Sequence, residues 1–139
     1  MKKYLFSVGL LGLIGVGIAF YLYNKPHKDI KSSKTDFTME AEQLFSEFEE
    51  NEAEANIKYL DKIIEVKGTV REMSSDEEGN VSVILNSKND FSGVICQLDN
   101  LTTHKKTKFN PGESVVFKGI CAGMLMDVVM VRCVEVEVK

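Results

Sequence analysis

The stretch that most limits the fold of this chain is residues 59–73, which read YLDKIIEVKGTVREM. From Ile64 to Arg71 an apolar residue or glycine alternates with a polar one, which is the period of two expected for a strand with one buried face. Gly68 falls on the apolar side. A glycine there weakens packing and costs backbone entropy, so it usually marks a bend or bulge where a sheet coils tightly. The stretch predicts the first long strand of a small closed barrel.

Four more strands are expected after this one, with turns between them. They cover residues 81–85, 93–98, 114–121 and 127–138. Before the first strand, a helix is expected to begin at Asp36 or Thr38, because acids follow in its first turn. Its buried face consists of Ala41, Leu44, Phe45 and Phe48. Near Asn51 the period weakens, so the helix either continues or restarts. The pattern predicts an all-β domain with one preceding helix, either a five-stranded barrel or a sandwich fragment.

The amino-terminal segment has the composition of a membrane anchor. Residues 4–23 contain no charged residue, and as a helix they would rise about 30 Å, the thickness of the hydrocarbon layer. Cleavage as a secretory signal is the alternative, but Ala19-Phe20-Tyr21 lacks the small residues of a cleavage site. Lysines stand on both sides of the segment, so charge alone does not orient it. The short tail favours a single-pass signal-anchor that places the following domain outside the cytoplasm, on the periplasmic side.

Charge and composition divide the chain into three parts. Residues 1–23 are the predicted transmembrane helix, residues 24–36 form a polar linker with Pro26, and residues 37–139 form the predicted domain. From Thr35 onward there are eleven basic and twenty acidic residues, a net charge of −9. Such a domain repels phosphate backbones on average, which weighs against general nucleic-acid binding.

Two spaced motifs in the expected strands resemble a known family. They are Lys58-Tyr59 followed by Val66-x-Gly68-x-Val70, and Val115-x-x-Lys118-Gly119-x-Cys121-x-Gly123. These motifs, over about residues 44–136, are similar to those of the tRNA-anticodon-binding-like (tRNA_anti-like) family of small, mostly uncharacterised bacterial proteins. The resemblance implies an OB-fold, a five-stranded Greek-key barrel. The family name records a likeness of fold to anticodon-binding domains and does not establish a function.

One group of side chains is the candidate ligand site of this barrel. Phe91 precedes the third strand. The long loop after this strand carries His104, Lys105, Lys106 and Lys108. Aromatic and basic side chains of this kind would stack on bases and follow a nucleic-acid backbone. The alternative is that the loop is exposed and only keeps the domain soluble.

The three cysteines, Cys96, Cys121 and Cys133, all lie in apolar strand contexts. No CxxC pair or neighbouring histidine accompanies them, so neither zinc binding nor thiol catalysis is expected, and buried thiols are the simplest interpretation. In an OB barrel the third and fifth strands are neighbours, so the resemblance implies Cys96 and Cys133 as the pair for a disulfide outside the cytoplasm.

No catalytic constellation, metal site or cofactor motif is recognisable in the sequence. We therefore expect a membrane-anchored binding module that is not an enzyme, with a protein or an envelope component as its ligand. A membrane-tethered nucleic-acid-binding domain is the alternative.

Overall fold

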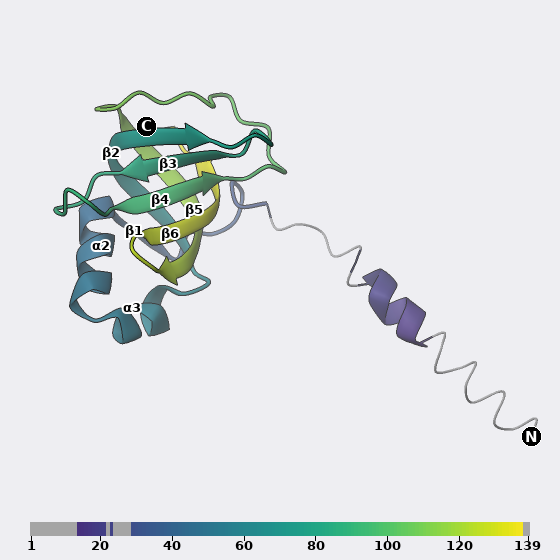
Figure 1. The fold of residues 1–139 in the computed structure, drawn as a ribbon. Helices are drawn as coiled ribbons and strands as arrows, with labels where there is room; N and C mark the ends of the chain where they lie inside the picture. Colours follow the sequence, from purple (N-terminus) through teal and green to yellow (C-terminus); the bar gives the residue numbers. More distant parts are fainter. Residues whose placement is uncertain (1–13, 22, 24–28, 138–139) are drawn as a thin grey trace, which may run out of the picture.

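A computed structural model describes residues 14–21, 23 and 29–137 (Figure 1). The elements from Phe37 onward are one short strand, two helices and five further strands. In chain order they are β1 (Phe37–Glu40), α2 (Ala41–Glu50), α3 (Glu52–Tyr59), β2 (Ile63–Ser75), β3 (Val81–Leu85), β4 (Val94–Leu98), β5 (Ser114–Met124) and β6 (Val128–Glu135).

Strands β2 to β6 form a closed five-stranded barrel, as the sequence predicts, and β1 is one strand more. The hydrogen-bonded order is β1-β2-β3-β4-β6-β5, and the pairing of β2 with β5 closes the barrel. Strands β4 and β6 run parallel, whereas the other neighbours within the barrel are antiparallel. This arrangement is consistent with the OB-fold.

Strand β2 is the element around which the barrel closes. Its first seven residues pair with β5, and five of its last six pair with β3. The register with β3 shifts between Val70 and Glu72, beyond Gly68, whose own pairing with Val115 of β5 is regular. Gly68 has a packing role: a Cβ atom there would lie 3.0 Å from the Ala41 Cβ and 3.2 Å from the Leu85 Cβ. The absent side chain lets the start of α2 and strand β3 both approach β2.

The segment before the barrel differs from the prediction of one helix starting at Asp36 or Thr38. Phe37–Glu40 is a strand that pairs in parallel with β2, with Phe37 opposite Ile64 and Met39 opposite Val66. The Asp36 carboxylate accepts a hydrogen bond from the Ile63 N–H (2.9 Å), which fixes the start of this pairing. The helix therefore begins only at Ala41.

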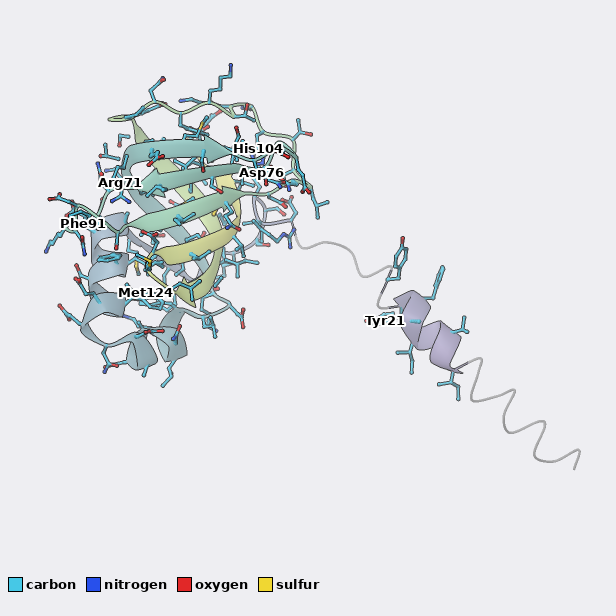
Figure 2. The ribbon with its side chains drawn as sticks, in the orientation of Figure 1. Tyr21, Arg71, Asp76, Phe91, His104 and Met124 are labelled. Carbon is cyan, nitrogen blue, oxygen red and sulfur yellow. The ribbon has the colours of Figure 1, made fainter. Side chains whose placement is uncertain are left out.

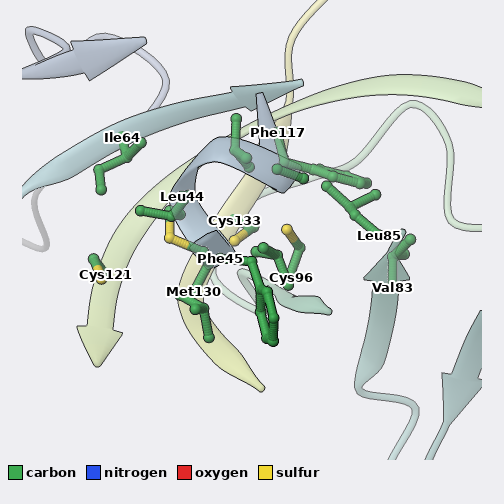
Figure 3. Close-up of a cluster of buried hydrophobic side chains, with 14 of the residues drawn as sticks. Leu44, Phe45, Ile64, Val83, Leu85, Cys96, Phe117, Cys121, Met130 and Cys133 are labelled. Atoms are coloured by element: carbon green, nitrogen blue, oxygen red, sulfur yellow. The ribbon is translucent and has the colours of Figure 1, made fainter. Parts of the chain in front are cut away.

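The helical part is two helices, because the chain restarts at Asn51. The Asn51 side chain caps α3 by accepting a hydrogen bond from the Glu54 N–H at 3.2 Å. The predicted apolar face of α2 is confirmed, since Ala41, Leu44, Phe45 and Phe48 are all buried. Helix α2 packs against β2, β4 and β6 and fills one end of the barrel, where Leu44 and Phe45 meet the barrel core (Figure 3).

The described part of the predicted linker lies against the barrel. Ile30 is fully buried beside Ile63 and Val134. The ammonium group of Lys118, a buried residue of β5, donates to the backbone carbonyls of Lys31 and Ser33. These contacts fasten residues 29–33 to the outside of the sheet. Residues 24–28, the rest of the predicted linker, lie outside the described residues.

The predicted single-pass membrane localisation is corrected by the structure. Most of the predicted transmembrane segment, residues 1–13 and 22, lies outside the described residues. Within residues 14–21, 23 and 29–137, no helix has the length and apolar character required to cross a bilayer.

Candidate binding surface

The loop that carries the predicted lysines, residues 99–113, is organised by Asp99. This residue is 4% exposed, and its carboxylate accepts a hydrogen bond from the Thr102 hydroxyl at 2.8 Å. The His104 ring Nε2 lies 2.7 Å from the Asp99 carbonyl oxygen. Burial raises the pKa of the Asp99 carboxyl, but the hydrogen bonds from Thr102 and Leu101 and the nearby Arg132 together outweigh it, so the pKa is lowered. His104 is thus part of the loop's own structure.

Two of the three predicted lysines are engaged with carboxylates. Lys105 pairs with Glu137 (2.8 Å), which raises the pKa of Lys105. Lys106 pairs with Glu113 and places its ammonium group 4.9 Å from the centroid of the Phe109 ring. Phe109 itself is buried. The loop therefore offers a nucleic acid less free positive charge than its sequence indicates.

Phe91 does not join the lysine loop. It lies in residues 86–93, the loop before β4, whereas the lysines follow β4. A strand of five residues spans about 17 Å, so the two groups lie at opposite ends of the sheet, as Figure 2 shows for Phe91 and His104. The predicted ligand site is thus split into two separate places.

The loop with Phe91 is fastened to the turn between β5 and β6. The Gly93 N–H donates to the Asp127 carboxylate at 2.6 Å, and the Val128 N–H donates to the Gly93 carbonyl at 3.0 Å. On its other side, the Arg71 guanidinium donates to the carbonyls of Ser92 (3.1 Å) and Asp90 (3.4 Å). These bonds hold the loop while the Phe91 ring is 91% exposed.

Large apolar side chains gather at this end of the barrel. Leu125 and Met126, in the β5–β6 turn, are 89% and 76% exposed. Helix α3 adjoins them, since a Cβ atom on Gly123 would lie 3.7 Å from Leu60 Cδ1. Ile57 on α3 and Leu60, which directly follows α3, are also exposed. We name this surface the apolar end; its residues are Ile57, Leu60, Phe91, Leu125 and Met126.

Of these five residues, the sequence pattern predicts only Phe91 as a site residue. A signal for two others was present: Leu125-Met126 is an apolar pair between two strands, where turns usually carry polar residues or glycine. Of the exposed large apolar residues from Asp29 to Glu137, Leu101 alone lies elsewhere, in the lysine loop. From Asp29 to Glu137, the exposed large apolar side chains other than Leu101 therefore lie on the three segments of the apolar end.

A concave surface, of about 490 Å³, lies beside Lys118. Its charged lining consists of Lys31, Lys105, Lys106 and Lys118 on the positive side and Glu65, Glu135 and Glu137 on the negative side. Because four lysines face three glutamates, the cavity has only a small excess of positive charge.

The three cysteines are buried free thiols in the structure. Cys96 and Cys133 are hydrogen-bond neighbours, and burial followed by this contact raises the pKa of Cys133 well above its ordinary value. The predicted disulfide between them stays a prediction. Within residues 14–21, 23 and 29–137 no group of three or more histidine, cysteine, aspartate or glutamate side chains is arranged to hold a metal ion.

The barrel and its capping helix define a small OB-fold domain. The model of the tRNA_anti-like family matches residues 1–135, and the chain belongs to this family, as its motifs predict. The match extends over the amino-terminal segment, which lies outside the expected range of residues 44–136. The comparisons with curated proteins and with solved structures gave no match.

Proposed function

We propose that this protein is a binding module rather than an enzyme, and that its ligand is another protein held at the apolar end. The observation that carries the proposal is the grouping of five exposed large apolar residues on three adjoining segments. Contiguous exposed apolar surface is uncommon on monomeric proteins and marks interaction sites. Aromatic and methionine side chains are also enriched in protein interfaces.

The outer face of the neighbouring sheet supports the same function. In β3, β4 and β6 the flanking residues are buried, so Ile84, Ile95 and Val129 face outward by alternation. Register places Ile84 beside Ile95, and Ile95 beside Val129. These half-buried side chains form an apolar row across the face that OB-folds commonly use for ligands.

The same face lacks the features of a nucleic-acid-binding OB-fold. The sequences of β3 (VSVIL) and β4 (VICQL) contain no aromatic and no basic residue. Stacking of bases needs aromatic rings, and a nucleic-acid backbone needs positive charge along the groove. A protein is therefore the ligand class that we propose.

Site-specific photocrosslinking in the source cells tests this function. A photoreactive amino acid replaces Leu125 in one variant of the full chain and Leu101, the exposed leucine of the lysine loop, in the control. We expect a discrete protein adduct from position 125 that is weak or absent from position 101. Equal adducts from both positions, no protein adduct, or an adduct that nuclease removes would overturn the proposal.

A further inference from the structure

The acidic residues of the two helices define the chemistry around the apolar end. Residues 41–62 contain seven acidic and two basic residues. Lys58 forms an ion pair with Glu47, with 2.9 Å between the Lys58 Nζ and a Glu47 carboxylate oxygen. Five other acids in this part of the chain form no ion pair with any described residue. They are Glu49 and Glu50 at the end of α2, Glu52 and Glu54 in α3, and Asp61 after α3.

Two of these uncompensated carboxylates, those of Glu54 and Asp61, adjoin the exposed apolar residues. Glu54 lies three residues before Ile57 on α3, which puts both side chains on the same face of the helix. Asp61 directly follows Leu60, and its backbone N–H donates to the Cys121 carbonyl at 2.9 Å, so it lies beside the end of β5. The apolar end is thus bordered by negative charge on the side of α3.

From this arrangement we infer that the partner is a cationic amphipathic segment, with apolar side chains that enter the apolar end and lysines or arginines that meet the carboxylates beside it. The inference rests on the proposed function and adds the charge of the partner. Opposite charges at the rim of an apolar contact accelerate association and exclude wrong partners. A helix with one apolar face is a common form of such a segment.

The same charges argue against two other occupants. A second copy of this chain would bring its own acidic helices against these, because symmetric dimers use the same surface twice. Like charges across an interface are destabilising. A nucleic acid would meet the same repulsion. Measurement of the molar mass of the free protein at increasing concentration tests for a dimer of this chain. A concentration-dependent dimer that Leu125→Ser abolishes would overturn the inference.

Three labelled peptides test the charge of the partner with the full-length chain. The first is an amphipathic helix of leucine and lysine, the second has glutamate in place of every lysine, and the third has serine in place of every leucine. Fluorescence anisotropy gives the affinity of each at two salt concentrations. We expect the leucine–lysine peptide to bind at least about tenfold more tightly than either of the others, and added salt to weaken it.

Three variants locate the binding. Leu125→Ser with Met126→Ser is expected to weaken the leucine–lysine peptide about tenfold, and Ile57→Ser serves as an independent change on α3. Replacement of Glu49, Glu50, Glu52 and Glu54 by glutamine is expected to weaken binding and to reduce its salt dependence. The controls are Leu101→Ser and Glu77→Gln with Glu78→Gln in the β2–β3 turn, which should change neither quantity. Circular dichroism verifies that each variant is folded.

The inference is overturned when the leucine–glutamate peptide binds as well as the leucine–lysine peptide, or when the four glutamine changes leave affinity and salt dependence intact. It is also overturned when no peptide binds. The photocrosslinking result separates these failures from failure of the proposed function: a discrete protein adduct at position 125 upholds a protein-binding surface even where the cationic peptide does not bind.

Discussion

At the scale of single residues, the link between the two helices is Tyr59. Its ring is fully buried against Phe37, with 5.0 Å between the ring centroids. Its hydroxyl donates to a Glu47 carboxylate oxygen at 2.6 Å, and Lys58 donates to the same oxygen. The Tyr59 bond, followed by that of Lys58, lowers the pKa of Glu47. A hydrogen bond to a charged acceptor is among the stronger bonds in proteins.

Removal of this hydroxyl by Tyr59→Phe should lower the free energy of unfolding by about 1–2 kcal/mol at neutral pH. Because the pKa of Glu47 is lower in the folded state than in the unfolded state, its contribution is present above pH 4.5 and is lost as pH falls through the folded-state pKa. The variant should therefore lose less stability than the parent between pH 7 and pH 3. Urea unfolding at both pH values measures this, with Glu49→Gln as control. An unchanged pH dependence in Tyr59→Phe would contradict it.

The buried thiols give a second prediction at this scale. Cys96 and Cys133 are buried on the neighbouring strands β4 and β6, and we predict one disulfide in a chain held under oxidising conditions. Mass spectrometry after alkylation of the unfolded chain measures it: one alkylated thiol is expected without reductant and three with it. Three alkylated thiols in both samples would show that the pair stays reduced.

At the scale of elements, the contact between α2 and the barrel depends on Gly68. Gly68→Ala would place a methyl group 3.0 Å from the Ala41 Cβ, a distance at which a neighbouring atom must move. We expect a loss of about 1–3 kcal/mol in the free energy of unfolding, which is typical of overpacking in a core. Thermal unfolding measures it. Gly17→Ala is the matched control, since a Cβ atom there has nothing within 4 Å. An equal effect of both changes would contradict the role of close packing at Gly68.

The alternation of apolar and polar residues was enough to predict the five barrel strands, because each strand has one face toward a single core. The same reasoning failed at β1. Residues Asp36 and Thr38 have the side chains of a helix cap, and the acids after them fit a first helical turn. In the folded chain, Phe37–Glu40 instead pairs with β2, a strand more than twenty residues later. Only the closed barrel provides that partner, so the local sequence could not show it.

At the scale of the whole molecule, the candidate surface could not be predicted because three separate segments form it. Phe91 was singled out together with His104 for their kinds of side chain, yet β4 carries the chain from one end of the sheet to the other between them. Leu125 and Ile57 became functional candidates only when the Asp127–Gly93 bond and the packing of α3 on β5 placed their segments side by side.

The distribution of charge over the molecule gives the last prediction, for Lys105→Ala, Lys106→Ala and Lys108→Ala combined. Because Lys105 and Lys106 already meet carboxylates and residues 35–139 carry a net charge of −9, we expect the parent and the triple variant to bind single-stranded oligonucleotides equally weakly. Fluorescence anisotropy with labelled oligothymidylate over a range of salt concentrations measures this.

A nucleic-acid function of the loop would give a different result. The three lysines would each neutralise a phosphate, and the slope of log affinity against log salt would become shallower by about 2 in the triple variant. Lys62→Ala, which removes one exposed lysine outside the loop, is the control for a general effect of charge. A fall in affinity with the shallower slope in the triple variant, absent in the control, would favour the nucleic-acid alternative over a protein ligand.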